Sequence, residues 1–292
     1  MRRILFLGFL LLLTGVFPLL HAQVGVRLEF PRNEFLTYET IPAEVTLHNN
    51  SAETVTLRGT EMNRWLNFRI RDNHDNIIAR AGDFREDKDL VLEPGQQAAR
   101  IINLTRLYGL RRPGRYSVRA EVTANNTTVS PSKFIFIEEG IPLRRLKLHY
   151  KDTETGKNDV TDVTLIEYPK TGEPRLYLRM ESDTRNAVLC NISLMPLLMK
   201  ETIQTQVDGE SNLHILFRTG PRAFGYVAFD CQGRPIALDL YTNTNSNPSL
   251  KVTENREVLV EGGTLLPKEK NDPIPASRNP QIIRPEAKKP KN

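Results

Sequence analysis

The residue types that usually carry out catalysis are sparse and scattered in this chain. It has no Gly-x-Ser-x-Gly, His-Glu-x-x-His or Cys-x-x-Cys motif and no phosphate-binding glycine loop. After residue 22 the histidines are His48, His74, His149 and His214, and no two have the spacing of metal ligands. The sequence therefore favours a protein without cofactor, metal or catalytic residues. Acidic residues are numerous, so a catalytic carboxylate pair stays open as an alternative.

One segment has the residue types of a binding surface. Trp65, the only tryptophan, opens a stretch in which apolar and polar residues alternate through residue 71. A period of two places Trp65 on the same face as Arg69 and Arg71. Aromatic and arginine side chains are enriched at interfaces, so these three residues form a candidate binding face. The alternative is that Trp65 precedes the strand and packs over the rim of the fold.

The two cysteines, Cys190 and Cys231, both lie in the second half of the chain. Cys190 has the strand parity of an inward-facing residue, and Cys231 lies in an Asp-Cys-Gln-Gly turn. A disulfide between them and two separate thiols are both open alternatives. A reactive thiol is disfavoured, because no histidine or basic residue stands close enough to activate either sulfur.

The elements that must position these residues are β-strands. From Val24 to Ile137, short segments alternate apolar and polar residues, and turn-forming residues separate them. Strands of this kind with one apolar face predict an antiparallel sandwich. The chain is thus expected to be all-β, with a first sandwich of seven or eight strands over residues 23–138.

A tyrosine motif supports that assignment. Leu110 and the Pro113-Gly114 turn precede Tyr116, from which alternating apolar residues run to Val122. This spacing resembles the tyrosine corner of immunoglobulin-like and fibronectin-like sandwich modules. The resemblance implies a sandwich in which Leu110, Gly114 and Tyr116 have structural roles. It implies no particular ligand, and residues 23–138 lack the cysteines of true immunoglobulin domains.

The second half of the chain reads as another antiparallel β domain, over residues 139–265. Glu138–Pro142 is the expected boundary, because charged residues, a glycine and a proline separate two strand-rich regions. The meander from Gln206 to Tyr241 is weakly similar to β-propeller blades, but too few residues remain for a closed ring. We expect an open sheet or a sandwich, with propeller-like blades as the alternative and one helical turn at Met195–Glu201.

Both ends of the chain differ from the body. Residues 1–22 have the basic start, apolar run and small final residue of a signal peptide. Residues 266–292 carry six prolines and a charge of +4, and we expect a disordered basic tail. The formal charge of the whole chain is +5, so the excess positive charge is local to the tail. This distribution disfavours nucleic acid as a partner.

These observations predict an exported, periplasmic or secreted binding protein that recognises a protein or glycan at the cell envelope. No transmembrane segment is expected after signal cleavage, and the tail could add weak attachment to an anionic surface. The first alternative is a secreted hydrolase, or a hydrolase accessory module, acting on polysaccharide or peptide. The second is a structural envelope subunit that pairs through an open sheet edge.

Overall fold

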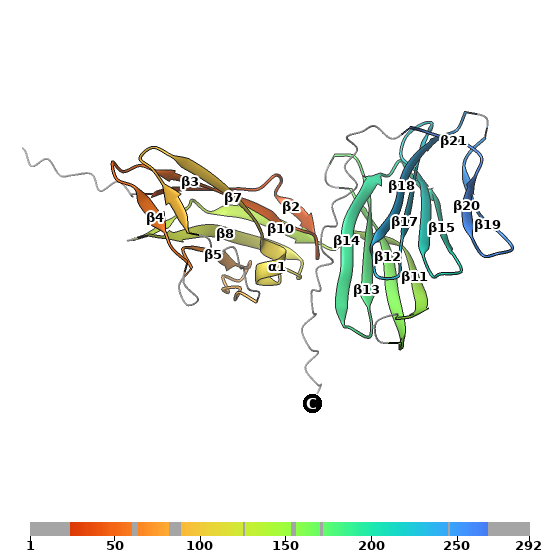
Figure 1. The fold of residues 1–292 in the computed structure, drawn as a ribbon, viewed down its shortest axis with the longest axis horizontal. Helices are drawn as coiled ribbons and strands as arrows, with labels where there is room; N and C mark the ends of the chain where they lie inside the picture. The colour runs from red at the N-terminus through yellow and green to blue at the C-terminus, as the bar shows by residue number, and fades with distance from the viewer. Residues whose placement is uncertain are drawn as a thin grey trace, which may run out of the picture.

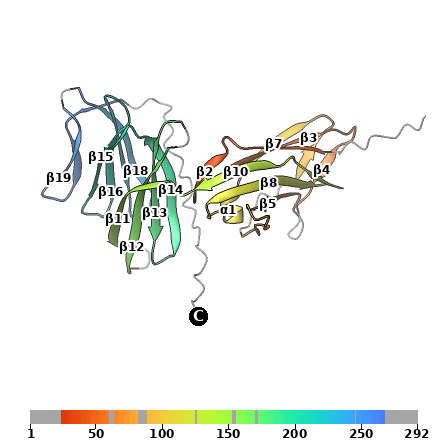
Figure 2. The ribbon, with the colours of Figure 1, turned by 180° about the vertical axis from the view of Figure 1, so that it is seen from behind.

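The computed structural model describes residues 24–59, 64–81, 89–124, 126–152, 156–169, 172–244 and 246–267. The described chain is almost entirely β-strand, arranged in mainly antiparallel sheets, which confirms the all-β class. Figures 1 and 2 show two β bodies placed end to end. The expected signal peptide lies outside the described residues, as does the tail beyond Pro267.

The first body is a sandwich of two sheets. One sheet has the order β1 (Val24–Glu29), β3 (Pro42–Asn49), β7 (Gln97–Asn103). The other has the order β2 (Glu34–Leu36), β10 (Lys133–Glu138), β8 (Gly114–Thr123), β5 (Leu66–Arg71), with β9 (Thr127–Val129) on β8. A short pair, β4 (Val55–Leu57) and β6 (Leu90–Leu92), lies at the end away from the second body (Figure 1). Among the described strands, only β2 pairs in parallel, with β10. The two-sheet arrangement is that of an immunoglobulin-like sandwich.

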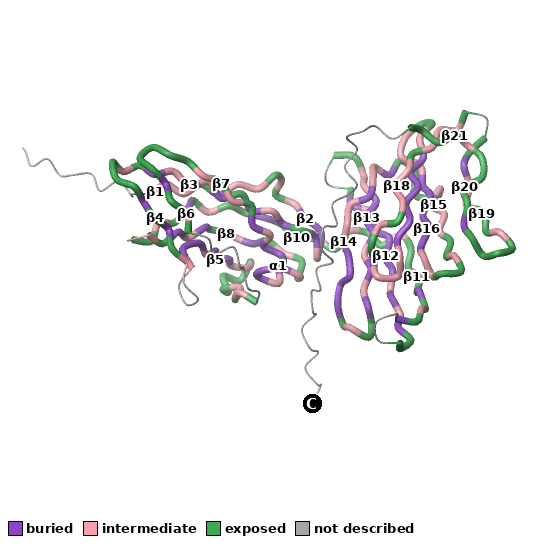
Figure 3. The backbone as a smooth tube through the Cα atoms, viewed as in Figure 1, coloured by how far each residue is buried: buried purple, intermediate pink, exposed green. Residues whose placement is uncertain are grey.

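Alternation along the strands builds the core of this sandwich. In β8, Tyr116, Val118, Ala120 and Val122 are buried, and the residues between them face outward. Figure 3 shows buried residues along the strands of both bodies and exposed residues mainly in the turns. Burial of the apolar face is the main stabilising term of such a sandwich.

The tyrosine corner has the expected geometry. The Tyr116 hydroxyl donates a hydrogen bond of 2.8 Å to the carbonyl oxygen of Arg112. Leu110 is buried beneath it, and Gly114 begins β8 with a φ of 152°, which glycine tolerates. Burial raises the pKa of the Tyr116 phenol, so the hydroxyl stays protonated and able to donate.

Tyr116→Phe is expected to lower the free energy of unfolding by about 1–2 kcal/mol, because it leaves the Arg112 carbonyl without this donor. Urea unfolding of the variant and the wild type measures the difference. Tyr241→Phe is the control, since the Tyr241 hydroxyl makes no hydrogen bond to a described residue, and it should change stability less. Equal losses in the two variants would contradict the structural role of the corner.

Among the described residues, one helix that was not predicted from the sequence interrupts the strand pattern. α1 (Leu104–Tyr108) ends at Gly109, whose φ of 56° is left-handed. Leu104, Leu107 and Tyr108 are buried with helical spacing, and that spacing was the available signal. Among the described residues, no helix has the length and hydropathy needed to cross a membrane.

The second body also consists of two main sheets. The first has the order β11 (Ile141–Lys151), β12 (Asn158–Tyr168), β13 (Arg175–Ser182), β14 (Ala187–Pro196). The second has the order β15 (Met199–Val207), β16 (Leu213–Arg218), β17 (Ala223–Phe229), β18 (Pro235–Thr242), β21 (Thr264–Leu265). A hairpin of β19 (Ser249–Val252) and β20 (Val258–Glu261) packs beside β15 (Figure 1).

The two main sheets share one core, so the second body is a sandwich. Buried residues from both sheets, among them Val163, Leu178, Ile215 and Phe229, form a single cluster. Strands β11–β14 of the first sheet and strands β15–β18 of the second are each a four-stranded meander, as in a propeller blade, and β21 adds a fifth strand to the second sheet. The two sheets pack face to face. The helical turn expected at Met195–Glu201 is wrong, because β14 runs to Pro196 and β15 starts at Met199, and the strand ladders satisfy this backbone.

The two bodies are joined by a short, tightly packed connection. β10 ends at Glu138 and β11 begins at Ile141. Leu36 of β2 packs in a cluster with Ile166, Tyr168 and Tyr177 of the second body. Figures 1 and 2 show the ends of β2 and β10 against that body.

Polar contacts reinforce this junction. The Tyr177 hydroxyl donates to the carboxylate of Glu39 at 3.3 Å, and the amide of Leu36 donates to the same carboxylate at 2.8 Å. Arg32 pairs with Glu39 as well. The side-chain amide of Asn191 donates to the Thr37 carbonyl at 2.9 Å. The junction therefore contains a buried carboxylate with cationic and hydrogen-bond partners, as buried charges require.

Candidate functional site

Trp65 does not lie on the expected binding face. Its side chain is only 5% exposed and belongs to the core of the first sandwich. The strand β5 starts one residue later, at Leu66, so the alternation does not determine the direction of the Trp65 side chain. The interpretation of Trp65 as an exposed contact residue is therefore wrong, and the alternative that it packs into the fold describes the structure.

The burial of Trp65 predicts its fluorescence. Emission of the folded protein should be blue-shifted, and iodide should not quench it, because the indole is shielded from water. Unfolding in urea should shift the emission to the red and make it sensitive to iodide. Efficient quenching of the folded protein would contradict the position of Trp65 in the core.

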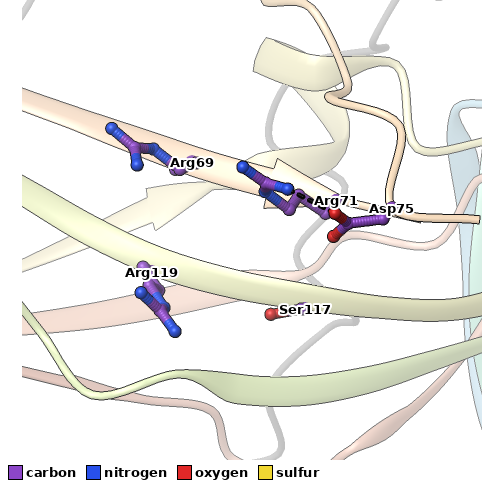
Figure 4. A pocket seen from close by; sticks show the side chains of 5 residues that line it. All are labelled: Arg69, Arg71, Asp75, Ser117 and Arg119. Atoms are coloured by element: carbon purple, nitrogen blue, oxygen red, sulfur yellow. Dashed lines mark hydrogen bonds and ion pairs between the residues drawn. The ribbon is translucent and has the colours of Figure 1, made fainter. Parts of the chain in front are cut away.

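Arg69 and Arg71 do face outward from β5, as alternation predicts. β5 lies next to β8, where Arg69 is paired with Arg119 and Arg71 with Ser117. Arg69, Arg71, Asp75, Ser117 and Arg119 line a pocket of about 320 Å³ on this face. Figure 4 shows the two arginines along β5 opposite Arg119 and Ser117 on β8.

Ion pairs hold two of the three pocket arginines. The Arg69 Nε atom lies 2.7 Å from the Glu121 carboxylate, and the Arg71 Nη1 atom lies 2.6 Å from the Asp75 carboxylate. Arg119 is exposed and makes no hydrogen bond or ion pair with a described residue. Three guanidinium groups and one hydroxyl thus surround a space in which, of the described lining residues, only Asp75 supplies negative charge.

Exposed aromatic residues extend the same face onto β10. Phe134 is paired with Ser117 and Phe136 with Arg115, and both rings point outward with 44% and 37% exposure. The Arg115 guanidinium stacks 3.9 Å from the centre of the Phe134 ring. We call the surface formed by Arg69, Arg71, Arg115, Ser117, Arg119, Phe134 and Phe136 the arginine–phenylalanine face.

Of the residues of this face, only Arg69 and Arg71 were predicted from the sequence. The buried parity of Tyr116 and Val118 was a signal that Arg115 and Arg119 point outward. The parity of Ile135 gave the same signal for Phe134 and Phe136. Alternation within single strands does not predict that β5 pairs with β8 and β8 with β10, and this pairing brings the residues together.

The cysteines do not form a reactive site. Both thiols are free in the structure, which therefore has the alternative of two separate thiols and no disulfide between Cys190 and Cys231. Burial raises the pKa of Cys190 to about 12. Burial also raises the pKa of Cys231, and the neighbouring Asp230 carboxylate adds to that rise. High pKa values keep both sulfurs protonated, and the protonated thiol is a poor nucleophile.

The acidic turns are structural. In three hairpins an aspartate accepts hydrogen bonds from the backbone amides two and four residues later: Asp72, Asp208 and Asp230. His214 lies between the Asp208 carboxylate, at 3.1 Å, and the Tyr226 hydroxyl, at 2.8 Å, and it is buried. Within the described residues, no group of three or more His, Cys, Asp or Glu side chains could hold a metal ion.

One carboxylate pair lines a second pocket, of about 540 Å³, on the sheet of β11–β14. Asp162 and Glu181 are directly opposite on β12 and β13. Lys147 lies 2.9 Å from Asp162, and Arg179 lies 3.4 Å from Glu181. Both carboxylate side chains are also 37% exposed. A glycosidase needs one carboxyl group that is protonated and shielded from water, and neither group has that environment.

Comparison with known proteins does not assign the chain to a family. No protein-family model matches it, and the search of curated proteins finds no match.

Proposed function

We propose that this chain is an exported, non-enzymatic binding protein that holds an anionic protein or glycan of the cell envelope or extracellular space against its arginine–phenylalanine face. The observation that carries the proposal is the gathering of four arginines and two exposed phenylalanines on one face of the first sandwich. Export rests on the sequence of residues 1–22, which has the three parts of a signal peptide.

The face has the chemistry of an interface more than that of an ordinary surface. Exposed phenylalanine rings contribute little to folding, whereas aromatic and arginine side chains provide much of the binding energy in protein interfaces. The stacking of Arg115 on Phe134 restricts both side chains before a partner arrives. Restriction of this kind lowers the entropy lost on binding. Because β5, β8 and β10 are neighbouring strands of one sheet, an extended partner can contact all three together.

A pair of double variants tests the proposal with dextran sulfate and polyglutamate as anionic probes, one a sulfated glycan and the other a polycarboxylate. Arg115→Gln with Phe134→Ser removes the stacked pair from the face. Arg27→Gln with Ile101→Ser removes an exposed arginine and an isoleucine that is 69% exposed from the opposite sheet. Both variants keep the basic tail, so its attraction to anions is the same in each.

The first double variant is expected to bind at least one probe about tenfold more weakly than wild type, since a loss of about 1.4 kcal/mol corresponds to that factor. The control variant should bind like wild type. Equal affinities for both variants and the wild type would overturn the proposal. N-terminal sequencing of the protein from its native host tests export, because a mature chain beginning near Gln23 is expected.

A further inference from the structure

Two arginines stand directly opposite each other on neighbouring strands of the arginine–phenylalanine face. Arg69 of β5 and Arg119 of β8 are register partners. Like charges in this position repel and destabilise a sheet. The Glu121 carboxylate, 2.7 Å from Arg69, offsets part of this repulsion, but Arg119 has no anionic partner among the described residues. Within the described part of the chain, the Arg119 guanidinium is therefore uncompensated and lies beside two other guanidinium groups.

The surrounding residues complete a set of donors. Arg71 follows Arg69 by two residues on the same face, and neighbouring strands lie about 4.8 Å apart. Arg69, Arg71 and Arg119 thus line one pocket together, and their long, flexible side chains have the reach to contact a ligand held there. Ser117 is opposite Arg71 and hydrogen-bonds to Ser132 at 2.7 Å. This bond holds the Ser117 hydroxyl in the pocket lining, and with Ser132 as the donor the Ser117 proton is available to an anion.

We propose that this pocket binds one tetrahedral oxyanion, a phosphate or sulfate group carried by the partner. The inference rests on the proposed function and names the chemistry of its anionic group. Arg119 is the principal ligand, Ser117 donates its proton to the anion while it accepts one from Ser132, and Arg69 and Arg71 reach the anion from β5. The pocket volume of about 320 Å³ leaves room for the first part of the molecule that carries the anion.

The carboxylates of Glu121 and Asp75 favour a tetrahedral oxyanion over a carboxylate as the ligand. Glu121 and Asp75 already offer carboxylate oxygens to Arg69 and Arg71. A carboxylate ligand presents two oxygens in one plane and suits a single guanidinium. A phosphate monoester has three acceptor oxygens and a charge of about −1.5 to −2, so it can bridge guanidinium groups on two strands.

Two variants with opposite expected effects test the site. Arg119→Gln removes the principal ligand from an exposed position, so it should leave folding intact. Asp75→Asn removes the carboxylate that holds Arg71, and asparagine tolerates the φ of 64° at this position. Arg222→Gln is the matched control, because Arg222 is an exposed arginine in a turn of the second body.

Isothermal titration with inorganic phosphate, sulfate and acetate at constant ionic strength provides the measurement. We expect saturable phosphate or sulfate binding by wild type, at least about tenfold weaker binding by Arg119→Gln, tighter binding by Asp75→Asn and no change in Arg222→Gln. Acetate that binds as well as phosphate and sulfate would overturn the proposal. Unchanged phosphate and sulfate binding in Arg119→Gln would overturn it too.

A second titration separates the sources of the anion and the two proposals. A sugar phosphate, a sulfated disaccharide and vesicles containing phosphatidic acid each present the group on a different carrier, and tighter binding of one of them supports the site and identifies its source. If Arg119→Gln binds phosphate and sulfate like wild type while Arg115→Gln with Phe134→Ser loses polyanion binding, the oxyanion pocket is wrong and the proposed function stands. If Arg119→Gln keeps its phosphate and sulfate binding and Arg115→Gln with Phe134→Ser keeps its polyanion binding, both the oxyanion pocket and the proposed function are contradicted.

Discussion

Asp159→Ala is expected to destabilise the protein by about 3–5 kcal/mol, because it removes the acceptor at the centre of a buried polar cluster. The Asp159 carboxylate accepts hydrogen bonds from the Tyr150 hydroxyl at 2.9 Å, the Ser182 hydroxyl at 3.1 Å and the Val160 amide at 2.7 Å. The Thr184 hydroxyl donates to it as well. Without the carboxylate, these donors at the end of the second sandwich lose their partner.

The same cluster predicts a dependence on pH. Burial raises the pKa of Asp159, but the hydrogen bonds from Thr184, Tyr150, Val160 and Ser182 outweigh it, and the pKa lies below its usual value. A carboxyl group with a lowered pKa stabilises the fold above the unfolded pKa, about 3.9, and that stabilisation is lost as the pH falls through the folded pKa.

Urea unfolding of wild type and Asp159→Asn at a series of pH values measures this effect. The difference in unfolding free energy between them should be constant near neutral pH and should shrink below about pH 4. A difference that does not change with pH would show that the charge of Asp159 contributes nothing to stability. If Asp159→Ala were as stable as the wild type, the structural role of the polar cluster would be contradicted.

Gly140→Ala is the second substitution with a large expected effect. Gly140 lies at the connection between the two bodies with a φ of 71°, a left-handed conformation. An added Cβ would lie 2.6 Å from Ile166 Cγ2 and 2.9 Å from Leu36 Cδ2. The left-handed backbone costs about 1–2 kcal/mol and overpacking about 1–3 kcal/mol, so we expect a loss of about 3 kcal/mol.

Gly95→Ala separates these two contributions. Gly95 has a similar φ of 73°, but no atom lies within 4 Å of the position its Cβ would take. This variant should lose only the conformational part, about 1 kcal/mol. Equal losses in the two variants, measured by urea unfolding, would show that the junction around Gly140 is looser than the structure describes.

Local patterns in the sequence were enough for the fold class and for part of the site. Alternation within one strand orients Arg69 and Arg71 without knowledge of the neighbouring strands. The prediction that Trp65 is exposed was wrong because Trp65 precedes the strand, and tertiary packing sets the direction of its side chain there. The hydrogen bond between Tyr177 and Glu39 joins residues 138 positions apart, and no local pattern contains that contact.

The central claim, that the arginine–phenylalanine face holds an anionic partner, is tested most directly by NMR titration of the wild-type protein with the dextran sulfate or polyglutamate that it binds. The arginine Nε–Hε signals of Arg69, Arg71, Arg115 and Arg119 and the ring signals of Phe134 and Phe136 report on the face. We predict saturable shifts of these signals and unchanged signals for Arg27 and Arg222. Shifts confined to residues elsewhere on the protein, with this face unchanged, would contradict the account.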